Sequence, residues 1–271
     1  MLEQGGNAID AAAAMCFCEV LLEPQNCGLG GEVPTLIYSA AERKTYAVSG
    51  MGWSPAAFTI DWCRQHGIDL IPGDGYLPAC VPAVVDTWAL ALARFGRFSF
   101  AQVLQPVIEL AEGGFAVYRE LLACLTNHAP RWKEHYPTTF AIYCPDGRIP
   151  QVGERLRNPD LAQTFRKIIQ AETAAAGRGR IAGLEAGRDA FYRGEIAERI
   201  ERFIVDHPVI DASGQAHPGL LTYEDMATWR AGLEEALHVN YRGLEVYKCS
   251  SWTQGPVFLQ QLTLLEGFDL A

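Results

Sequence analysis

The chain has 271 residues, 49% of them apolar, so it is long enough to bury a substantial core. Its 32 acidic and 22 basic residues give a formal net charge of −10, which argues against binding to nucleic acid or to an anionic lipid surface. No apolar run approaches the roughly 18 to 20 residues that span a bilayer, so we expect no membrane segment.

The chain opens on a predicted helix. Asn7 and Asp10 have the spacing of a capping box, and an alanine-rich helix is expected over residues 8–22, ending before Pro24. We interpret Asp10 as a capping carboxylate, with acid–base chemistry as the lesser alternative. The helix begins almost at once and no export signal precedes it, so both ends of the chain are expected to be cut from a longer protein.

A glycine-rich turn at residues 26–31 follows the first helix and precedes a strand. A phosphate-binding loop has the opposite order, because it needs the N-terminus of the next helix, so nucleotide binding is disfavoured. The turn is better explained by a tight backbone crossing at positive φ, or by a loop that lines a substrate pocket. Alternating apolar residues then predict a hairpin, with strands at 35–38 and 45–48.

The middle of the chain has mainly helical patterns. Ser99 and Gln102 form a second capping box, and the charged residues at 119–120 and 131–135 are interpreted as solvated helix faces. The segment at 174–187, rich in Ala, Gly and Arg, is expected to be an exposed loop or flexible insertion. Helices are expected at residues 57–66, 82–95, 100–112, 161–169 and 191–205.

The last part of the chain again mixes strand and helix. Thr222 and Asp225 predict the start of a short helix, strands are expected at 238–241 and 244–247, and a helix at 257–265. The sequence as a whole therefore predicts an α+β protein in which helix dominates and strands lie towards the two ends.

Cysteine and histidine patterns give no metal site. The eight cysteines lack any CxxC pair, and none stands at a metal-ligand spacing from the six histidines. We expect buried, reduced thiols, which slightly favours a cytoplasmic location, and we expect the histidines to be surface or capping residues. No G-x-S-x-G elbow and no Ser-His-Asp or Cys-His arrangement is evident, so the chain offers no catalytic residue, no metal ligands and no cofactor site.

A collinear set of phrases resembles the gamma-glutamyltranspeptidase family. Single phrases are weak evidence, but the set keeps one order from residue 5 to residue 267. The main phrases are GGNAIDAA (5–12), EPQNCGLGG (23–31), LQPVIELAEGGF (104–115), FYRGEIA (191–197), GLLTYEDM (219–226) and QQLTLLEG (260–267).

This resemblance implies a partial αββα Ntn-hydrolase sandwich, with residues 1–271 as a single incomplete domain that forms the helix-rich large-subunit portion. Family members cleave themselves before a threonine, whose hydroxyl then attacks the substrate with its own amine as base. That threonine follows the last phrase matched here. The resemblance therefore implies a missing small subunit that carries the N-terminal Thr, and a small amide or γ-glutamyl-like substrate. Family members are often periplasmic or extracellular.

Departures from the family pattern concern the substrate. Where transpeptidases carry an arginine that pairs with the α-carboxylate of the glutamyl group, this chain has Met51, within SGMGWSP at 49–55. Two further segments, 32–34 and 251–256, also differ from the family pattern. We therefore expect the divergent, acylase-like branch, with Met51 and Trp53 bordering the substrate pocket. The alternative is a non-catalytic product, truncated or separately encoded, that acts as a scaffold or binding partner.

Overall fold

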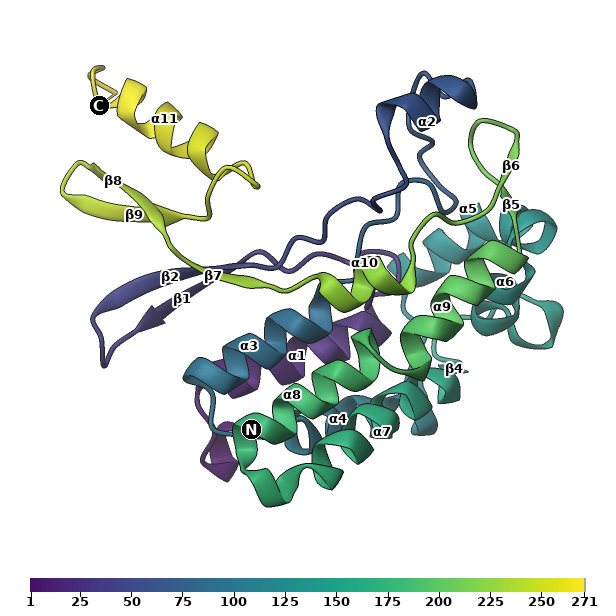
Figure 1. The fold of residues 1–271 in the computed structure, drawn as a ribbon, viewed down its shortest axis with the longest axis horizontal. Coiled ribbons are helices and arrows are strands. Elements are labelled where there is room, and N and C mark those ends of the chain that lie inside the picture. The colour runs from purple at the N-terminus through teal and green to yellow at the C-terminus, as the bar shows by residue number, and fades with distance from the viewer. Residues whose placement is uncertain (271) are drawn as a thin grey trace.

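The computed structural model describes residues 1–270, which form an α+β fold rich in helix, as the sequence predicts. Figure 1 shows a layer of helices beneath a narrow sheet, with the last helix standing apart from that layer. The helices are α1 (Ala8–Leu22), α2 (Ile60–Gln65), α3 (Val84–Phe95), α4 (Phe100–Gly113), α5 (Arg119–His135), α6 (Pro137–Tyr143), α7 (Pro159–Ala174), α8 (Arg180–Tyr192), α9 (Glu195–Asp206), α10 (Tyr223–Thr228) and α11 (Gly255–Leu265). The strands are β1 (Thr35–Ser39), β2 (Lys44–Ser49), β3 (Phe115–Ala116), β4 (Arg155–Leu156), β5 (Val209–Ile210), β6 (Ala216–His217), β7 (Gly232–Glu235), β8 (Leu237–Tyr241) and β9 (Leu244–Lys248).

The core lies within the helical layer, where α1 packs on α3 and α4, and α7 packs on α4 and α8. The alanines of α1 let its neighbours approach closely, and Ala13 is fully buried. Next to them Phe17 contacts Phe100 and Phe165 edge to face, with ring centroids 6.3 Å and 5.7 Å apart. Buried aromatic pairs of this geometry add to the free energy gained from burying their surface.

Asp10 caps α1, as predicted from the sequence. Its Oδ2 accepts a hydrogen bond from the backbone N–H of Asn7 (2.7 Å), which completes the capping box. Its Oδ1 also accepts hydrogen bonds from the backbone N–H groups of Arg97 and Phe98, both at 2.9 Å. The same carboxylate therefore fixes the start of α1 and the turn between α3 and α4.

One three-stranded antiparallel sheet, in the order β1-β2-β7, lies against the helices. Strand β7 joins from far along the sequence, pairing Gly232 with Ser49. Ile37 and Val48 point from this sheet into the main core. The described residues thus form one helical layer with a three-stranded sheet against it, and three further pairs of strands, β3-β4, β5-β6 and β8-β9.

Strands β8 and β9 form a separate two-stranded ribbon that packs with α11. We call residues 237–265 the C-terminal module. A small apolar cluster of Ala47, Ala236 and Cys249, with Trp252 packed against it, joins the module to the rest of the chain. The indole N–H of Trp252 also donates a hydrogen bond to Glu234 Oε2 in β7 (2.9 Å). Figure 1 shows the module projecting away from the helical layer.

Several sequence-based boundaries were wrong. Residues 174–187 are not a loop: they contain a 3-10 turn and the first half of α8, whose Gly183 and Gly187 pack against α7 and α4. The helix expected at 191–205 is two helices, α8 and α9, separated at Gly194. Helix α6 and strand β7 were not predicted. Among residues 1–270, no helix is both long and apolar enough to cross a membrane.

Candidate functional site

The segment at residues 50–55, which carries Met51 and Trp53, follows β2 and crosses the start of α3. Its two glycines allow a very close backbone approach. A Cβ added at Gly50 would lie 2.1 Å from the carbonyl oxygen of Val33, and one added at Gly52 would lie 1.7 Å from that of Val81. No side chain fits at such distances, so these glycines fix the segment between two neighbouring stretches of backbone.

Three backbone hydrogen bonds join this segment and the glycine turn to their neighbours. The N–H of Val33 donates to the carbonyl of Gly50 (2.7 Å), and the N–H of Val81 donates to that of Trp53 (3.0 Å). The N–H of Ala83 donates to the carbonyl of Gly31 (3.1 Å). The turn, the Met51 segment and the approach to α3 therefore form one rigid junction.

The glycine turn does not owe its composition to positive φ. Gly28, Gly30 and Gly31 all lie outside the positive-φ region, so that expectation was wrong. A Cβ at Gly31 would lie 3.0 Å from the carbonyl oxygen of Gly28, whereas Gly28 and Gly30 face open space. The turn is therefore tight at one position and unobstructed at two.

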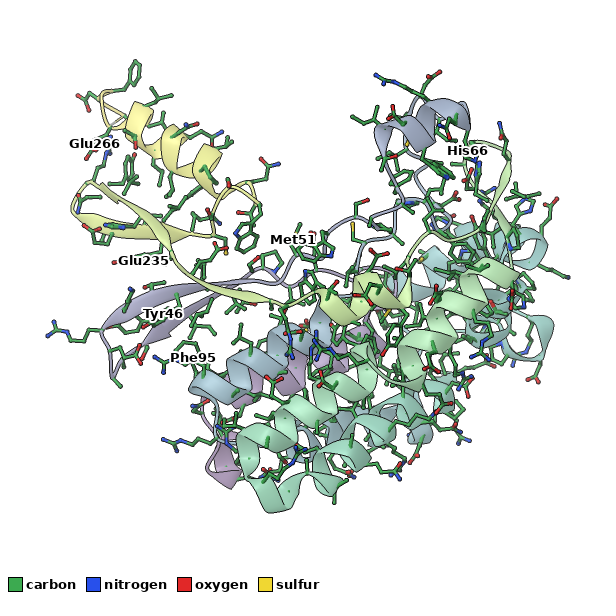
Figure 2. The ribbon with its side chains drawn as sticks, viewed as in Figure 1. Tyr46, Met51, His66, Phe95, Glu235 and Glu266 are labelled. Carbon is green, nitrogen blue, oxygen red and sulfur yellow. The ribbon has the colours of Figure 1, made fainter. Side chains whose placement is uncertain are left out.

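Met51 is half-buried, and 55% of the Trp53 surface is exposed. The indole N–H of Trp53 has no hydrogen-bond partner among the described residues. In Figure 2, Met51 lies where the sheet meets the helices, between the part of the chain that carries α2 and the part that carries α11. The two side chains come from one short segment, so the fold orients them but does not bring them together from a distance.

A buried polar network centred on Arg188 of α8 lies next to this junction and contacts the start of α3. Arg188 is fully buried; its Nε donates to Asp86 Oδ2 (2.6 Å), and its other nitrogens donate to Asp189 and to the carbonyl oxygen of Trp229. Burial raises the pKa of the Asp86 carboxyl, and the guanidinium of Arg188 opposes that shift.

The Tyr192 hydroxyl ties the same network to the chain just before α3. It donates a hydrogen bond to the carbonyl oxygen of Pro82 (2.6 Å) and accepts one from the N–H of Asp86 (3.2 Å). Burial raises the pKa of this phenol, which stays protonated. The sequence analysis did not find these residues, because Asp86 lies more than 100 positions from Arg188 and Tyr192, so the group leaves no local signal.

A second buried polar cluster lies in the β5–β6 hairpin. The ring of His217 is 2.7 Å from Asp211 Oδ2 through its Nδ1, and only 6% of its surface is exposed, so the expectation of a surface histidine was wrong here. The Ser213 hydroxyl donates to Asp211 Oδ1 (2.6 Å) and not to the imidazole. A nucleophile–base–acid triad needs the hydroxyl on the histidine, so this cluster is not arranged for nucleophilic catalysis.

The exposure of the cysteines differs in part from what the sequence predicts. All eight are free, but Cys27 and Cys80 are exposed, so the expectation of buried thiols was wrong for these two. Partial burial raises the pKa of both thiols, and nearby glutamates raise it further. Neither is therefore an activated thiolate. No group of three or more His, Cys, Asp or Glu side chains among residues 1–270 is placed to hold a metal ion.

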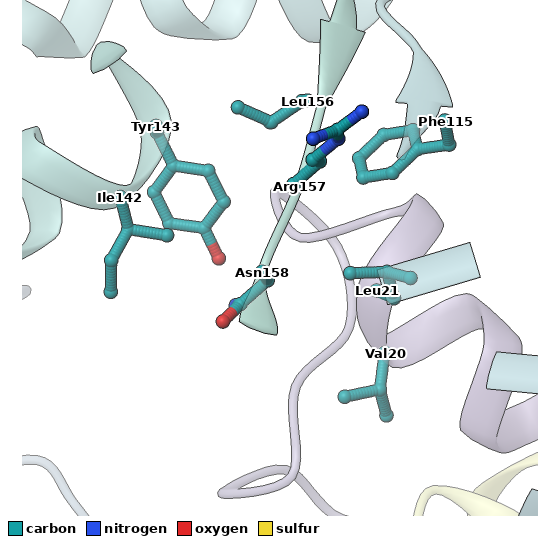
Figure 3. Close-up of a pocket in the computed structure, with 8 residues that line it drawn as sticks. All are labelled: Val20, Leu21, Phe115, Ile142, Tyr143, Leu156, Arg157 and Asn158. Atoms are coloured by element: carbon teal, nitrogen blue, oxygen red, sulfur yellow. The ribbon is translucent and has the colours of Figure 1, made fainter. Parts of the chain in front are cut away.

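The hollow drawn in Figure 3 is too small for a substrate. Val20, Leu21 and Phe115 line it on one side and Tyr143 on the other. Its volume is about 10 Å³, which is the space of roughly one water molecule. Neither Met51 nor Trp53 reaches it.

Comparisons with known proteins agree on one family. The family model described as gamma-glutamyltranspeptidase matches residues 1–271. The chain is 31% identical over 273 residues to the glutathione hydrolase-like YwrD proenzyme of Bacillus subtilis, covering 99% of this chain and 46% of that protein. It is 31% identical over 281 residues to the acylase ACY 1 proenzyme of Pseudomonas sp. strain SE83, covering 100% of this chain and 45% of that protein.

A solved structure shares the fold. The Helicobacter pylori gamma-glutamyltranspeptidase matches with a TM-score of 0.83 at 26% identity, over 100% of this chain and 71% of the matched chain. The chain spans less than half the length of the two curated relatives, the YwrD proenzyme and the acylase ACY 1 proenzyme.

Proposed function

The chain belongs to the gamma-glutamyltranspeptidase family, and we propose that it forms the large-subunit part of an N-terminal-nucleophile hydrolase or acyltransferase. In this proposal the attacking threonine belongs to a small subunit outside these 271 residues. The observation that carries it is the match of the family model to the whole chain, which covers 46% and 45% of two relatives that are both proenzymes.

The proposed chemistry is acyl transfer. The threonine hydroxyl attacks the amide carbonyl, its own α-amine takes the proton, the amine product leaves, and water or an amino acceptor resolves the ester. The present chain would supply one wall of the pocket. The backbone hydrogen bonds at Gly50 and Trp53 hold that wall rigid, so Met51 and Trp53 present a fixed surface to the acyl group.

Exposed apolar side chains support the existence of a companion subunit. On the C-terminal module they include Leu244, Phe258 and Leu264, of which Leu244 and Leu264 are 69% and 70% exposed. Large apolar residues exposed on one part of a protein in water mark a surface that another part of the protein covers.

The test of this proposal compares the 271-residue chain alone with the same chain produced together with its proposed companion. Amide hydrolysis is expected only from the pair, because the proposal places the nucleophile on the companion. Turnover by the purified isolated chain would refute the proposal. A pair that assembles and remains inactive would favour the alternative function, a non-catalytic scaffold.

We further propose that the substrate is a small amide other than a standard γ-glutamyl peptide. A thioether at position 51 cannot pair with an α-carboxylate, and losing one partner of such a pair costs roughly 2 to 5 kcal/mol. The exposed ring of Trp53 beside it offers an apolar contact instead. Both residues favour an acyl group without a charged head.

Met51→Arg tests the substrate proposal in the complete enzyme. The variant is expected to gain about tenfold or more in kcat/KM for γ-glutamyl-p-nitroanilide, and to lose activity towards an uncharged acyl anilide such as phenylacetyl-p-nitroanilide. Met15→Arg is the matched control, because Met15 is an exposed residue of α1 away from the junction. Efficient γ-glutamyl turnover by the unmodified enzyme, unchanged in Met51→Arg, would contradict the proposal.

A further inference from the structure

Glu32 lies between the glycine turn and β1, in one of the segments that differ from the family pattern. The hydrogen bond from the N–H of Val33 to the carbonyl oxygen of Gly50 (2.7 Å) continues the register of the β1–β2 hairpin by two residues. The next pair in this register is Glu32 and Met51. Residues directly opposite one another in an antiparallel pair carry their side chains on the same face, with Cβ atoms about 5 Å apart.

The backbone on either side of Glu32 is held in place. The carbonyl oxygen of Gly31 accepts a hydrogen bond from the N–H of Ala83 (3.1 Å), and Val33 is bonded to Gly50. The Glu32 side chain is exposed, and its carboxylate makes no hydrogen bond or ion pair with any residue of the described range 1–270. A fixed stretch of backbone therefore presents an unpaired negative charge at the junction.

The thiol of Cys80 gives a second indication of where this charge lies. Cys80 is exposed and directly precedes Val81, whose N–H donates to the carbonyl oxygen of Trp53 (3.0 Å). Burial raises the pKa of the Cys80 thiol, and the negative charge of Glu32 raises it further. The carboxylate therefore acts on the side of the junction that carries Trp53, as well as opposite Met51.

The three side chains at this place have complementary chemistry. Met51 and the exposed ring of Trp53 offer apolar surface, and Glu32 beside them offers a charge without a partner. An alkyl chain that ends in an ammonium group matches both features. A carboxylate at the end of the same chain is repelled, because like charges at short distance oppose binding.

We propose that Glu32 sets the charge preference of this wall: among acyl groups that carry a charge, the enzyme selects those ending in an ammonium group over those ending in a carboxylate. The inference rests on the proposed function, because it takes the Met51 junction as the wall of the acyl pocket. Met51 and Trp53 contact the methylene chain, and Glu32 pairs with the ammonium group at its far end. Glu32 takes no part in the proton transfers.

Thiol labelling of the 271-residue chain tests the position of the Glu32 charge without any turnover. Two methanethiosulfonate reagents are compared, one carrying a trimethylammonium group and one a sulfonate, and peptide mass spectrometry gives each rate at Cys80. The ratio of the two rates is independent of the thiol pKa, which acts equally on both reagents. We expect Cys80 to react faster with the cationic reagent, and Glu32→Gln to reduce the ratio about threefold or more.

Cys27 is the internal reference for the labelling. It is also exposed, but the carboxylates that act on its thiol are Glu19 and Glu23, so its ratio should stay the same in Glu32→Gln. An unchanged ratio at Cys80 in this variant would overturn the proposal, because the charge would then lie away from the junction.

Turnover by the complete enzyme tests the substrate class. The p-nitroanilides of 6-aminohexanoate and adipate have chains of equal length that end in an ammonium group and a carboxylate. We expect kcat/KM to be about tenfold or more higher for the ammonium substrate. The uncharged heptanoyl p-nitroanilide reports the proposed function separately. If it is hydrolysed while the two charged substrates react equally, this inference is overturned and the proposed function stands.

Variants assign the preference to Glu32. Glu32→Lys is expected to reverse it, and Glu32→Gln to reduce it about fivefold or more. A purely structural role would lower both rates together, so an unchanged ratio in these variants would refute the inference. Glu198→Gln is the matched control, because Glu198 is exposed on α9 and the ratio should stay within about twofold. Circular dichroism checks each fold, and Glu32→Gln carries the test where Glu32→Lys fails to fold.

Discussion

At the scale of single residues, the buried charges explain more of this structure than the exposed ones. Asp86 and Arg188 are almost completely removed from water, yet each is satisfied by several hydrogen bonds. Removing one partner of such a buried pair leaves an uncompensated charge, so these residues act together. They hold the start of α3, and through it Val81 and Ala83, against the Met51 segment. Arg188 is therefore a structural residue of the junction.

The carboxylate of Asp211 leads to a prediction about pH. Burial opposes its ionisation, but hydrogen bonds from Ser213 and His217 outweigh that effect and lower its pKa. A lowered pKa in the folded state stabilises the protein above the unfolded value, about 3.9, and that contribution is lost as pH falls through the folded-state value. Asp211→Asn is therefore expected to reduce the free energy of unfolding at pH 7 by about 1 to 3 kcal/mol.

Urea unfolding at a series of pH values measures this effect. The difference in stability between the unmodified chain and Asp211→Asn should shrink as pH falls from 5 towards roughly 3. Asp206→Asn is the control, because Asp206 is exposed at the end of α9 and its replacement should matter little at any pH. A difference that stays constant down to the acid transition would contradict the assignment of Asp211.

At the scale of elements, short-range sequence patterns predicted the helix caps well. They failed where contacts with distant residues determine the secondary structure. The capping boxes at Asn7 and Ser99 form as predicted, because the cap and its partner are three residues apart. The short helix expected to begin at Thr222 also forms, and its start is a third capping box. Strand β7 was missed, because Gly232–Glu235 has no alternating apolar pattern and is held by pairing with β2.

Helix α8 shows why its glycines led to the wrong prediction of a loop at residues 174–187. Glycine near alanine and arginine favours a loop in isolation. In the fold, a Cβ at Gly187 would lie 2.9 Å from the Phe100 ring and 3.2 Å from the carbonyl oxygen of Ile168, so this glycine allows α8 to pack closely on α4 and α7. Periodicity within one segment carries no information about such an approach.

The candidate site was only partly predictable for the same reason. Met51 and Trp53 were identified through a local phrase, and their role in binding stays a prediction. The glycine turn was noticed, but its contact with Ala83 joins residues about 50 positions apart. The network around Arg188 spans longer separations still, so only the structure places it beneath the junction.

At the scale of the whole molecule, the chain consists of two parts that differ in how much apolar surface they bury. The helical layer and the main sheet share one continuous core, whereas the C-terminal module is attached through a cluster of three buried residues. Leu244, Phe258 and Leu264 of the module are exposed to water. Regions with few buried apolar contacts open at lower free energy than the core of the same protein.

Hydrogen exchange of the isolated chain should therefore divide along this boundary. Backbone amides of β8, β9 and α11 are expected to exchange at least tenfold faster than those of α4, α7 and α8, because the module opens without unfolding of the main core. Adding the companion subunit should slow exchange in the module by covering its apolar side, and leave α7 as an internal reference. Uniform protection in the isolated chain would mean that the module is already a stable part of the fold. Protection unchanged by the companion would mean that the apolar side of the module is not the surface on which the two subunits meet.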